Sequence, residues 1–168
     1  MPSGIPEPLK LVALDYEDLK IISAHLQDAV LRMADMAYMP AEQRFAAILS
    51  RFDWLAAEKD DGKHSNLRRC RCALRFDRVT RAQVHKIRPG EPSAVAELLA
   101  VTYEESDPPS GFITLYFAGE GAVRLQVECI EAELRDLGDV WRTAVKPEHT
   151  GCDAEIVPAA TRFIQNSK

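Results

Sequence analysis

The chain carries a basic segment, 68–88, in which eight arginine and lysine side chains accompany a single acidic one. Within this segment Arg69, Arg71 and Arg75 have the spacing that puts side chains on one face of a β-strand. A row of guanidinium groups binds phosphate or carboxylate through paired hydrogen bonds. One interpretation is therefore an anion-binding surface made by these three arginines together with Arg78.

The same arginines also fit an exposed strand that faces acidic neighbours. Charged side chains are mostly solvated surface, and opposite charges pair across neighbouring strands. We favour this interpretation, with partners among four glutamates: Glu97, Glu104, Glu105 and Glu128. No aromatic residues alternate with the arginines on this face to stack bases, so we do not expect nucleic acid as a partner.

A second candidate site is the pair His25 and Asp28, three residues apart in a segment with helical periodicity. That spacing puts both side chains on the same side of a helix. A carboxylate beside an imidazole orients it for general acid–base catalysis. Ser23 faces elsewhere, so no nucleophile accompanies the pair. The alternative interpretation is a structural histidine on a helix.

Cys70 and Cys72 are two residues apart, which places both thiols on one face of a strand. With Cys129 they could form a soft metal site, but the spacing of a four-ligand zinc site is absent. All three positions suit a small apolar side chain. We predict buried, reduced thiols and no metal. The chain also lacks a Gly-rich phosphate loop and the common hydrolase motifs, so we predict no cofactor.

The elements that must position these residues are organised around the segment 111–138. Ile113, Leu115 and Phe117 alternate with wetter positions, and the run 123–129 alternates in the same way. Two glycines, Gly119 and Gly121, separate the two runs. Glycine supplies the positive φ of a tight reversal, so the pattern predicts an antiparallel hairpin.

The hydrophobic period changes after this hairpin. Ile130, Leu134 and Leu137 lie at i, i+4 and i+7, which is one stripe of a helix. Gly138 follows at the position that commonly ends a helix. We therefore predict a short C-terminal helix over 130–137 that caps the sheet.

Asp15 has the features of an N-cap, and the periodicity after it predicts a first helix over 15–29. The segment 9–14 is predicted to be extended. Alternating patterns predict further strands over 30–39, 44–53, 69–76 with a continuation through 79–87 after a bend, and 97–105.

The connections between these strands are too short for crossover helices, so neighbouring strands should be antiparallel. The predicted fold class is α+β. It has about seven strands in a curled sheet or partly closed barrel, an N-terminal helix and a C-terminal capping helix, which is a pleckstrin-homology-like order. The alternative is an open antiparallel sheet with both helices on one face.

Length and composition favour a single globular domain. The chain has 168 residues, of which 46% are hydrophobic and 28% charged, and a net charge of −5. We predict a loose arm over 1–8, one domain over 9–149 and a tail over 150–168. The N-terminal segment lacks the pattern of a signal peptide, and no apolar run is long enough for a membrane span. We therefore predict a cytoplasmic protein without membrane contact.

Three stretches are distinctive together: LKLVALDYEDLKIISAHLQDAVLRMADMAYMP, RFAAILSRFDW and ITLYFAGEGAVRLQVECIEAELRDLG. They resemble a family of small alphaproteobacterial proteins whose domain has no known function. The resemblance covers Leu9 to His149. It implies a bacterial cytosolic protein and contributes no catalytic residue or cofactor.

Three functions stay open from the sequence. The one we favour is a non-enzymatic module that binds another protein, because no convergent catalytic set is recognisable. The second is a small enzyme that uses His25 and Asp28. The third is a binder of a small anion or nucleic acid through the arginine-rich strand.

Overall fold

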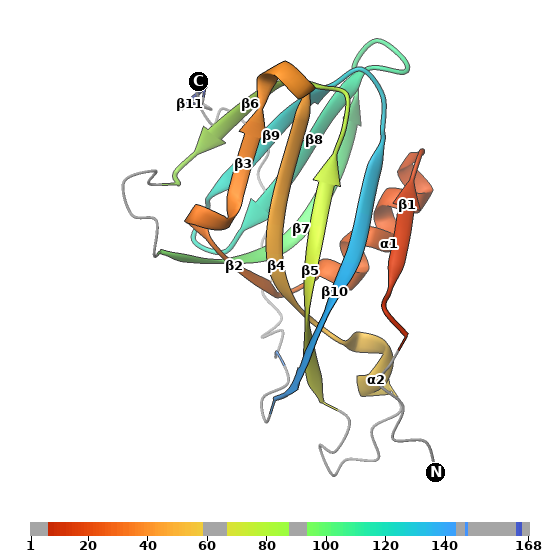
Figure 1. Cartoon of the computed structure of the whole chain (residues 1–168). Coiled ribbons are helices and arrows are strands. Elements are labelled where there is room, and N and C mark those ends of the chain that lie inside the picture. Colours follow the sequence, from red (N-terminus) through yellow and green to blue (C-terminus); the bar gives the residue numbers. More distant parts are fainter. Residues whose placement is uncertain (1–6, 59–66, 88–93, 144–146, 148–163, 166–168) are drawn as a thin grey trace.

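The computed structural model describes residues 7–58, 67–87, 94–143 and 147, and the backbone of 164–165. Within these residues the chain forms one antiparallel sheet of eleven strands (Figure 1). Two α-helices and two short 3₁₀ helices connect or cover the strands.

The elements follow one another with short connections. The strands are β1 (Lys10–Ala13), β2 (Ala29–Arg32), β3 (Met36–Met39), β4 (Arg44–Phe52), β5 (Arg68–Phe76), β6 (Val79–His85), β7 (Val95–Glu105), β8 (Gly111–Phe117), β9 (Ala122–Val127), β10 (Ala132–Arg142) and β11 (Ile164–Gln165). The helices are α1 (Tyr16–Leu26), α2 (Trp54–Glu58), η1 (Met33–Asp35) and η2 (Pro40–Glu42).

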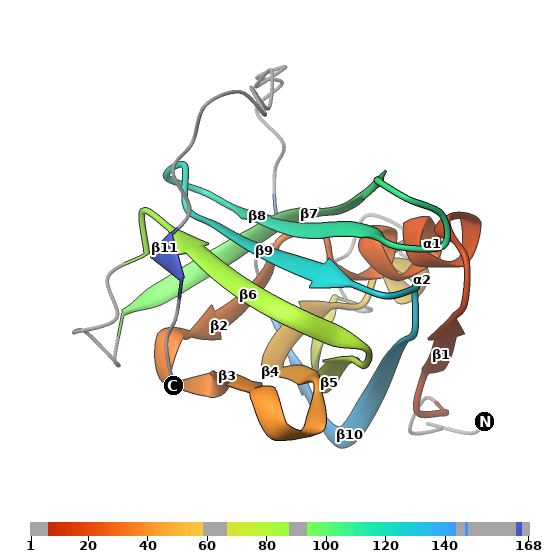
Figure 2. The same cartoon turned by 90° about the horizontal axis from the view of Figure 1, so that it is seen from above.

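The sheet is open and strongly curled. Its strand order is β1-β10-β5-β4-β2-β7-β8-β9-β6-β11, and β3 adds to β4. Figure 2 shows how the curl brings β7, β8, β9 and β6 over the strands β4, β5 and β10. Helix α1 lies beside the curl and packs against β7, β1 and β4.

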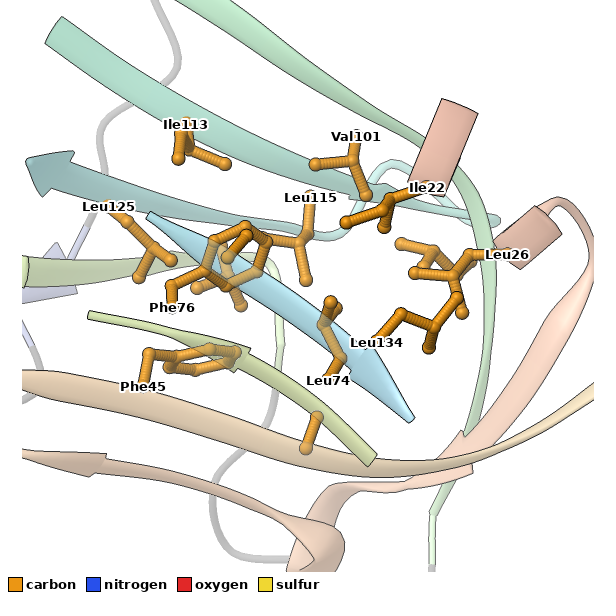
Figure 3. Packing of buried hydrophobic residues seen from close by; sticks show 14 of the residues in the cluster. Ile22, Leu26, Phe45, Leu74, Phe76, Val101, Ile113, Leu115, Leu125 and Leu134 are labelled. Atoms are coloured by element: carbon orange, nitrogen blue, oxygen red, sulfur yellow. The ribbon is translucent and has the colours of Figure 1, made fainter. Parts of the chain in front are cut away.

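The inner faces of the two halves of the sheet enclose one hydrophobic core (Figure 3). Strands β4, β5 and β10 contribute Phe45, Leu74, Phe76 and Leu134, while β7, β8 and β9 contribute Val101, Ile113, Leu115 and Leu125. Every second residue along β5 is buried, as expected for a strand with one face on a core. Helix α1 adds its stripe of Leu19, Ile22 and Leu26.

The start of α1 and the hairpin β8–β9 agree with the sequence prediction. The Asp15 side chain accepts a hydrogen bond of 2.8 Å from the backbone N–H of Asp18, which is an N-cap. In the hairpin Ile113 faces Leu125 across the strands. The turn takes its positive φ values from Gly119 (83°) and Glu120 (70°), so Gly121 does not supply one as expected.

The predicted C-terminal helix is wrong, because the segment after Val127 continues as strand β10. Ile130, Ala132 and Leu134 are all buried, so the burial period is two. Leu137, which completed the helical stripe, is 45% exposed. Strand β10 pairs with β1 on one side and β5 on the other, and this pairing outweighs local helix propensity. Gly138 has its positive φ at a register shift of β10 instead of at a helix end.

The count of about seven strands is also too low. The segment 30–39 divides into β2 and β3 around η1, and the segments 9–14 and 130–137 supply β1 and part of β10. The short helix α2 was not predicted. The pleckstrin-homology-like order is not confirmed, since β10 stands where the capping helix was expected. The predicted tail lies outside the described residues except for β11, which pairs with β6.

A pair of leucine substitutions distinguishes a strand from a helix in this segment. Leu134→Ala removes a fully buried side chain and should lower the free energy of unfolding by about 2–5 kcal/mol. Leu137→Ala should change it by about 0.5 kcal/mol or less, because Leu137 is largely exposed. Urea denaturation measures both. Similar large losses for the two variants would contradict the strand.

Candidate functional site

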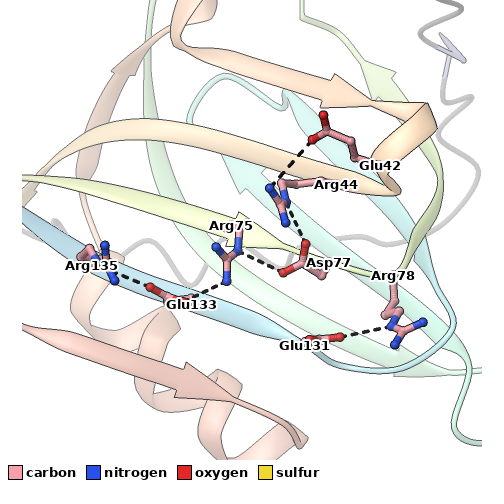
Figure 4. Close-up of polar contacts among 8 residues, drawn as sticks. All are labelled: Glu42, Arg44, Arg75, Asp77, Arg78, Glu131, Glu133 and Arg135. Atoms are coloured by element: carbon pink, nitrogen blue, oxygen red, sulfur yellow. Dashed lines mark hydrogen bonds and ion pairs between the residues drawn. The ribbon is translucent and has the colours of Figure 1, made fainter.

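Two of the four predicted anion-binding arginines are held by carboxylates. Arg75 forms ion pairs with Asp77 (3.0 Å) and Glu133 (2.9 Å), and Arg78 pairs with Glu131 (3.3 Å). Figure 4 shows these contacts as part of a chain of charges on the sheet surface. Both arginines therefore pair with acidic neighbours within the protein.

The partners of these two arginines differ from those predicted. None of the four glutamates that we expected pairs with Arg75 or Arg78 in the described structure. Glu133 and Glu131 lie on or next to β10, which is a neighbour of β5, and Asp77 directly follows β5. Because the segment 130–137 was predicted to be a helix, the pairing of Glu131 and Glu133 with these arginines was not predicted.

The other two arginines behave differently. Arg69 is half-buried and donates a hydrogen bond of 3.2 Å to the backbone carbonyl of Ser50. Burial lowers the pKa of its guanidinium, and the charges of Glu97 and Asp28 act in the opposite direction. Arg71 is exposed and has no acidic partner among the described residues. Arg71 is thus the arginine that remains available for an external acid.

His25 and Asp28 are not joined by a hydrogen bond or ion pair in the described structure. Helix α1 ends at Leu26, and Asp28 has a left-handed backbone with φ of 62°. The helical spacing that would align the two side chains therefore does not extend to Asp28. The Nδ1 atom of His25 is buried and has no hydrogen-bond partner.

The groups that act on His25 belong to a different set of residues. Burial lowers the pKa of His25, and the positive charge of Arg51 acts in the same direction. Asp53 and Asp136 partly offset these effects. These three residues belong to a buried cluster of charges that the sequence analysis did not find.

The centre of this cluster is an ion pair between Arg51 on β4 and Asp136 on β10. Nε of Arg51 donates to Oδ1 of Asp136 at 2.8 Å, and Nη2 donates to Oδ2 at 2.7 Å. The two side chains are only 5% and 7% exposed. Asp136 also anchors β1, because its Oδ2 accepts a hydrogen bond of 2.9 Å from the backbone N–H of Leu9.

A second pair completes the cluster. Nε of Arg68 donates to Oδ2 of Asp53 at 2.9 Å, and Oδ1 of Asp53 accepts from the backbone N–H of Ala56 at 3.1 Å. Asp53 therefore both neutralises Arg68 and begins α2. We call Arg51, Asp53, Arg68 and Asp136 the buried polar cluster. It borders a cavity of about 220 Å³.

The small thiols of β5 make room for the central ion pair. Strand β5 lies between β4 and β10, so Arg51 must reach Asp136 across it. The inward residues of β5 at this level are Cys70, opposite Arg51, and Cys72, opposite Asp136. Both thiols are buried, and burial raises the pKa of Cys72 to about 12. They are inert neutral side chains under native conditions, consistent with the predicted core role.

The period of each strand contained a signal for this cluster. Phe45, Ala47 and Leu49 form the inward row of β4, and Arg51 continues that row. Asp136 continues the inward row of β10 in the same manner after Leu134. A charge at a position where the alternation demands an apolar residue indicates a buried ion pair.

The opposite face of the same strands carries an open groove. Its volume is about 380 Å³, and an adjoining hollow of about 570 Å³ shares Asp35 and Ile48 with it. Trp141, which is 42% exposed, lines the groove together with Arg71. We call this the outer groove, lined by Val30, Arg32, Asp35, Ile48, Ser50, Arg71 and Trp141.

The described residues contain neither a cluster of metal-binding side chains nor a membrane-spanning helix. No three or more His, Cys, Asp and Glu side chains are grouped in a way that could hold a metal ion. No described helix has the length and apolar character needed to span a bilayer.

Comparison with known proteins places the chain in a family. Residues 9–149 match the family described as "Protein of unknown function (DUF2948)". The chain belongs to this family. The match covers the segment that carries the resemblance in the sequence, and it includes both the buried polar cluster and the outer groove. No curated protein and no solved structure matches the chain.

Removal of one partner of the buried ion pair should be costly. Asp136→Ala leaves the Arg51 guanidinium buried without its counter-ion, and we expect a loss of about 3–5 kcal/mol in the free energy of unfolding. The matched control is Glu131→Ala, which breaks the exposed pair with Arg78 and should cost about 1 kcal/mol or less. If denaturant titrations gave equally small losses in the free energy of unfolding for both variants, the buried pair would contribute no more to stability than the exposed one.

His25 should make stability depend on pH. Because its pKa in the folded protein lies below the ordinary 6.5, the unfolded chain binds more protons as the pH falls below that value. The free energy of unfolding should therefore fall as pH decreases from 6.5 through the folded pKa. His25→Gln removes this contribution. The difference in denaturation midpoint between pH about 7.5 and about 5.5 should shrink in the variant, and an unchanged difference would contradict the assignment.

Proposed function

We propose that the domain is a non-enzymatic module that binds an acidic, extended segment of another protein along the outer groove. The observation that carries this proposal is the state of Arg71. Arg71 is exposed in the groove with no acidic partner among the described residues, whereas Arg75 on the same face is held by Asp77 and Glu133.

The groove combines a charged anchor with apolar contacts. A carboxylate can accept two parallel hydrogen bonds from the guanidinium of Arg71. Trp141 and Ile48 line the same hollow, so an apolar side chain next to that carboxylate can be removed from water. Tryptophan and arginine are the residue types most often responsible for affinity in protein interfaces.

The extent of the groove favours a chain segment over a small molecule. The groove and its adjoining hollow run over β4, β5 and β10, whose neighbours are about 4.8 Å apart. The second hollow is bordered by Met39, Ala46, Ala73 and Leu137, which add small or apolar contacts. An extended segment with alternating acidic and apolar residues can place carboxylates near the arginines and apolar groups on the floor.

A small anion is the alternative occupant of the outer groove. The positions of His25 and Asp28 do not favour the enzyme hypothesis. Phosphate alone would use the charge of Arg71 but would leave Trp141 uncovered. The two occupants can therefore be distinguished by experiment. A peptide should cover the indole of Trp141, whereas phosphate should displace the peptide without contacting the indole.

The charge reversal Arg71→Glu tests this proposal. The probe is a fluorescein-labelled hexapeptide of alternating glutamate and leucine, titrated by anisotropy against the full chain. We expect saturable binding that weakens by at least about tenfold in Arg71→Glu. Binding should also weaken as salt is added.

The matched control is Arg78→Glu, which makes the same change in net charge outside the groove and should leave affinity within about twofold. An equal loss in both variants, or the absence of saturable binding, would contradict the proposal. Displacement of the peptide by millimolar inorganic phosphate, with no change in the Trp141 indole resonance, would assign the site to a small anion instead.

A further inference from the structure

The cavity beside the buried polar cluster is lined by arginine nitrogens that donate no hydrogen bond to any residue that the structure describes. Nε and Nη2 of Arg51 donate hydrogen bonds to Asp136, and Nε of Arg68 donates one to Asp53. Among the described residues, no acceptor is found for Nη1 of Arg51 or for the two terminal nitrogens of Arg68. Arg51 and Arg68 both line the cavity, so a ligand there can offer oxygen acceptors to these nitrogens.

The orientation of Arg68 indicates which kind of acceptor fits the cavity. Its Nε atom donates to Asp53. The two terminal nitrogens, Nη1 and Nη2, therefore remain at the end of the guanidinium group, where their N–H bonds can point in the same direction. A carboxylate matches such an end with two hydrogen bonds. Arg68 is 30% exposed, so a solute can reach this end from the cavity mouth, whereas Arg51 lies deeper at 5% exposure.

The charge of the lining limits how negative the ligand can be. Arg51 and Arg68 are balanced by Asp53 and Asp136, and Glu7 adds a further negative charge at the edge. The lining therefore carries a formal charge of about −1, which repels phosphate and other multiply charged anions. A single carboxylate is the acid that meets the donors with the least repulsion.

The remaining walls are apolar and the space is small. Leu9, Leu55, Ala56 and Val140 border the cavity. Its volume of about 220 Å³ lies below the usual range of about 300–1,000 Å³ for pockets that hold drug-sized ligands. At roughly 30 Å³ per water-sized group, it holds a ligand of about seven heavy atoms.

We propose that this cavity binds a small monocarboxylate with a short apolar body. The carboxylate lies against the end of Arg68 and Nη1 of Arg51. The apolar body lies along Leu55 and Val140. This site is separate from the outer groove, because the inward residues of β4, β5 and β10 face the cavity and their outward residues face the groove.

The test is a titration of the full chain with butyrate, followed by amide chemical shifts. We expect saturable shifts at Ala56 and Cys70, and no saturable shifts with n-butanol, which has a similar apolar body but no carboxylate. Arg68→Gln should weaken butyrate binding by at least about tenfold, while the matched variant Arg78→Gln should leave it unchanged.

A second variant covers the case in which Arg68→Gln does not fold. Leu55→Ala changes an exposed residue at the cavity wall, and it should weaken butyrate binding more than acetate binding. Binding of butyrate that is insensitive to both Arg68→Gln and Leu55→Ala would overturn the proposal. So would the absence of saturation, or inorganic phosphate binding as tightly as butyrate. Arg71→Glu should leave butyrate binding unchanged, so this test and that of the outer groove fail independently.

Discussion

The ion pair between Arg51 and Asp136 is the interaction on which the arrangement of this half of the sheet depends. It bridges β4 and β10 over β5, and Asp136 holds Leu9 of the first segment at the same time. Burial alone would lower the pKa of Arg51, but the hydrogen bonds and charge of Asp136 outweigh it and leave the pKa raised. The Arg51 guanidinium therefore stays charged inside the protein.

Such a pair constrains register more than it adds net stability. Removing two charges from water is expensive, and their attraction repays the cost only with good geometry. If β10 slipped by one residue against β5, Asp136 would turn to the solvent face and leave Arg51 alone. An unpaired Arg51 in the wrong register thus costs more free energy than the ion pair contributes in the correct register. Cys70 and Cys72 are part of this arrangement, because the Arg51 and Asp136 side chains must meet across the inner face of β5, where the two small thiols lie.

The sequence predicted those parts of the fold whose signals are local. Asp15 and the stripe of Leu19, Ile22 and Leu26 were sufficient for α1, and the alternation around Gly119 was sufficient for the hairpin. Strand β10 could not be predicted in this way, because its segment fits both periods and only its pairing with β1 and β5 decides between them. Leu137 completed the helical pattern by coincidence and is exposed.

The same misreading concealed the candidate sites. Without β10 as a neighbour of β5, neither Glu133 beside Arg75 nor Asp136 beside Arg51 could be anticipated. The groove and the cavity are therefore products of pairing between segments distant in sequence. They lie on opposite faces of the same three strands, with Arg71 and Trp141 outward and Arg51 and Asp136 inward.

The bond between Leu9 and Asp136 joins residues separated by 127 positions. A nascent chain therefore releases β1 and β4 from the ribosome long before β10 exists. Until then Arg51 has no counter-ion and the inner row of β4 has no finished core to enter. Contacts between such distant segments close late and slowly. Strand β10 thus fixes the positions of β1 and β4 late in synthesis, and a ribosome-bound fragment that ends before Asp136 would still keep Arg51 in water.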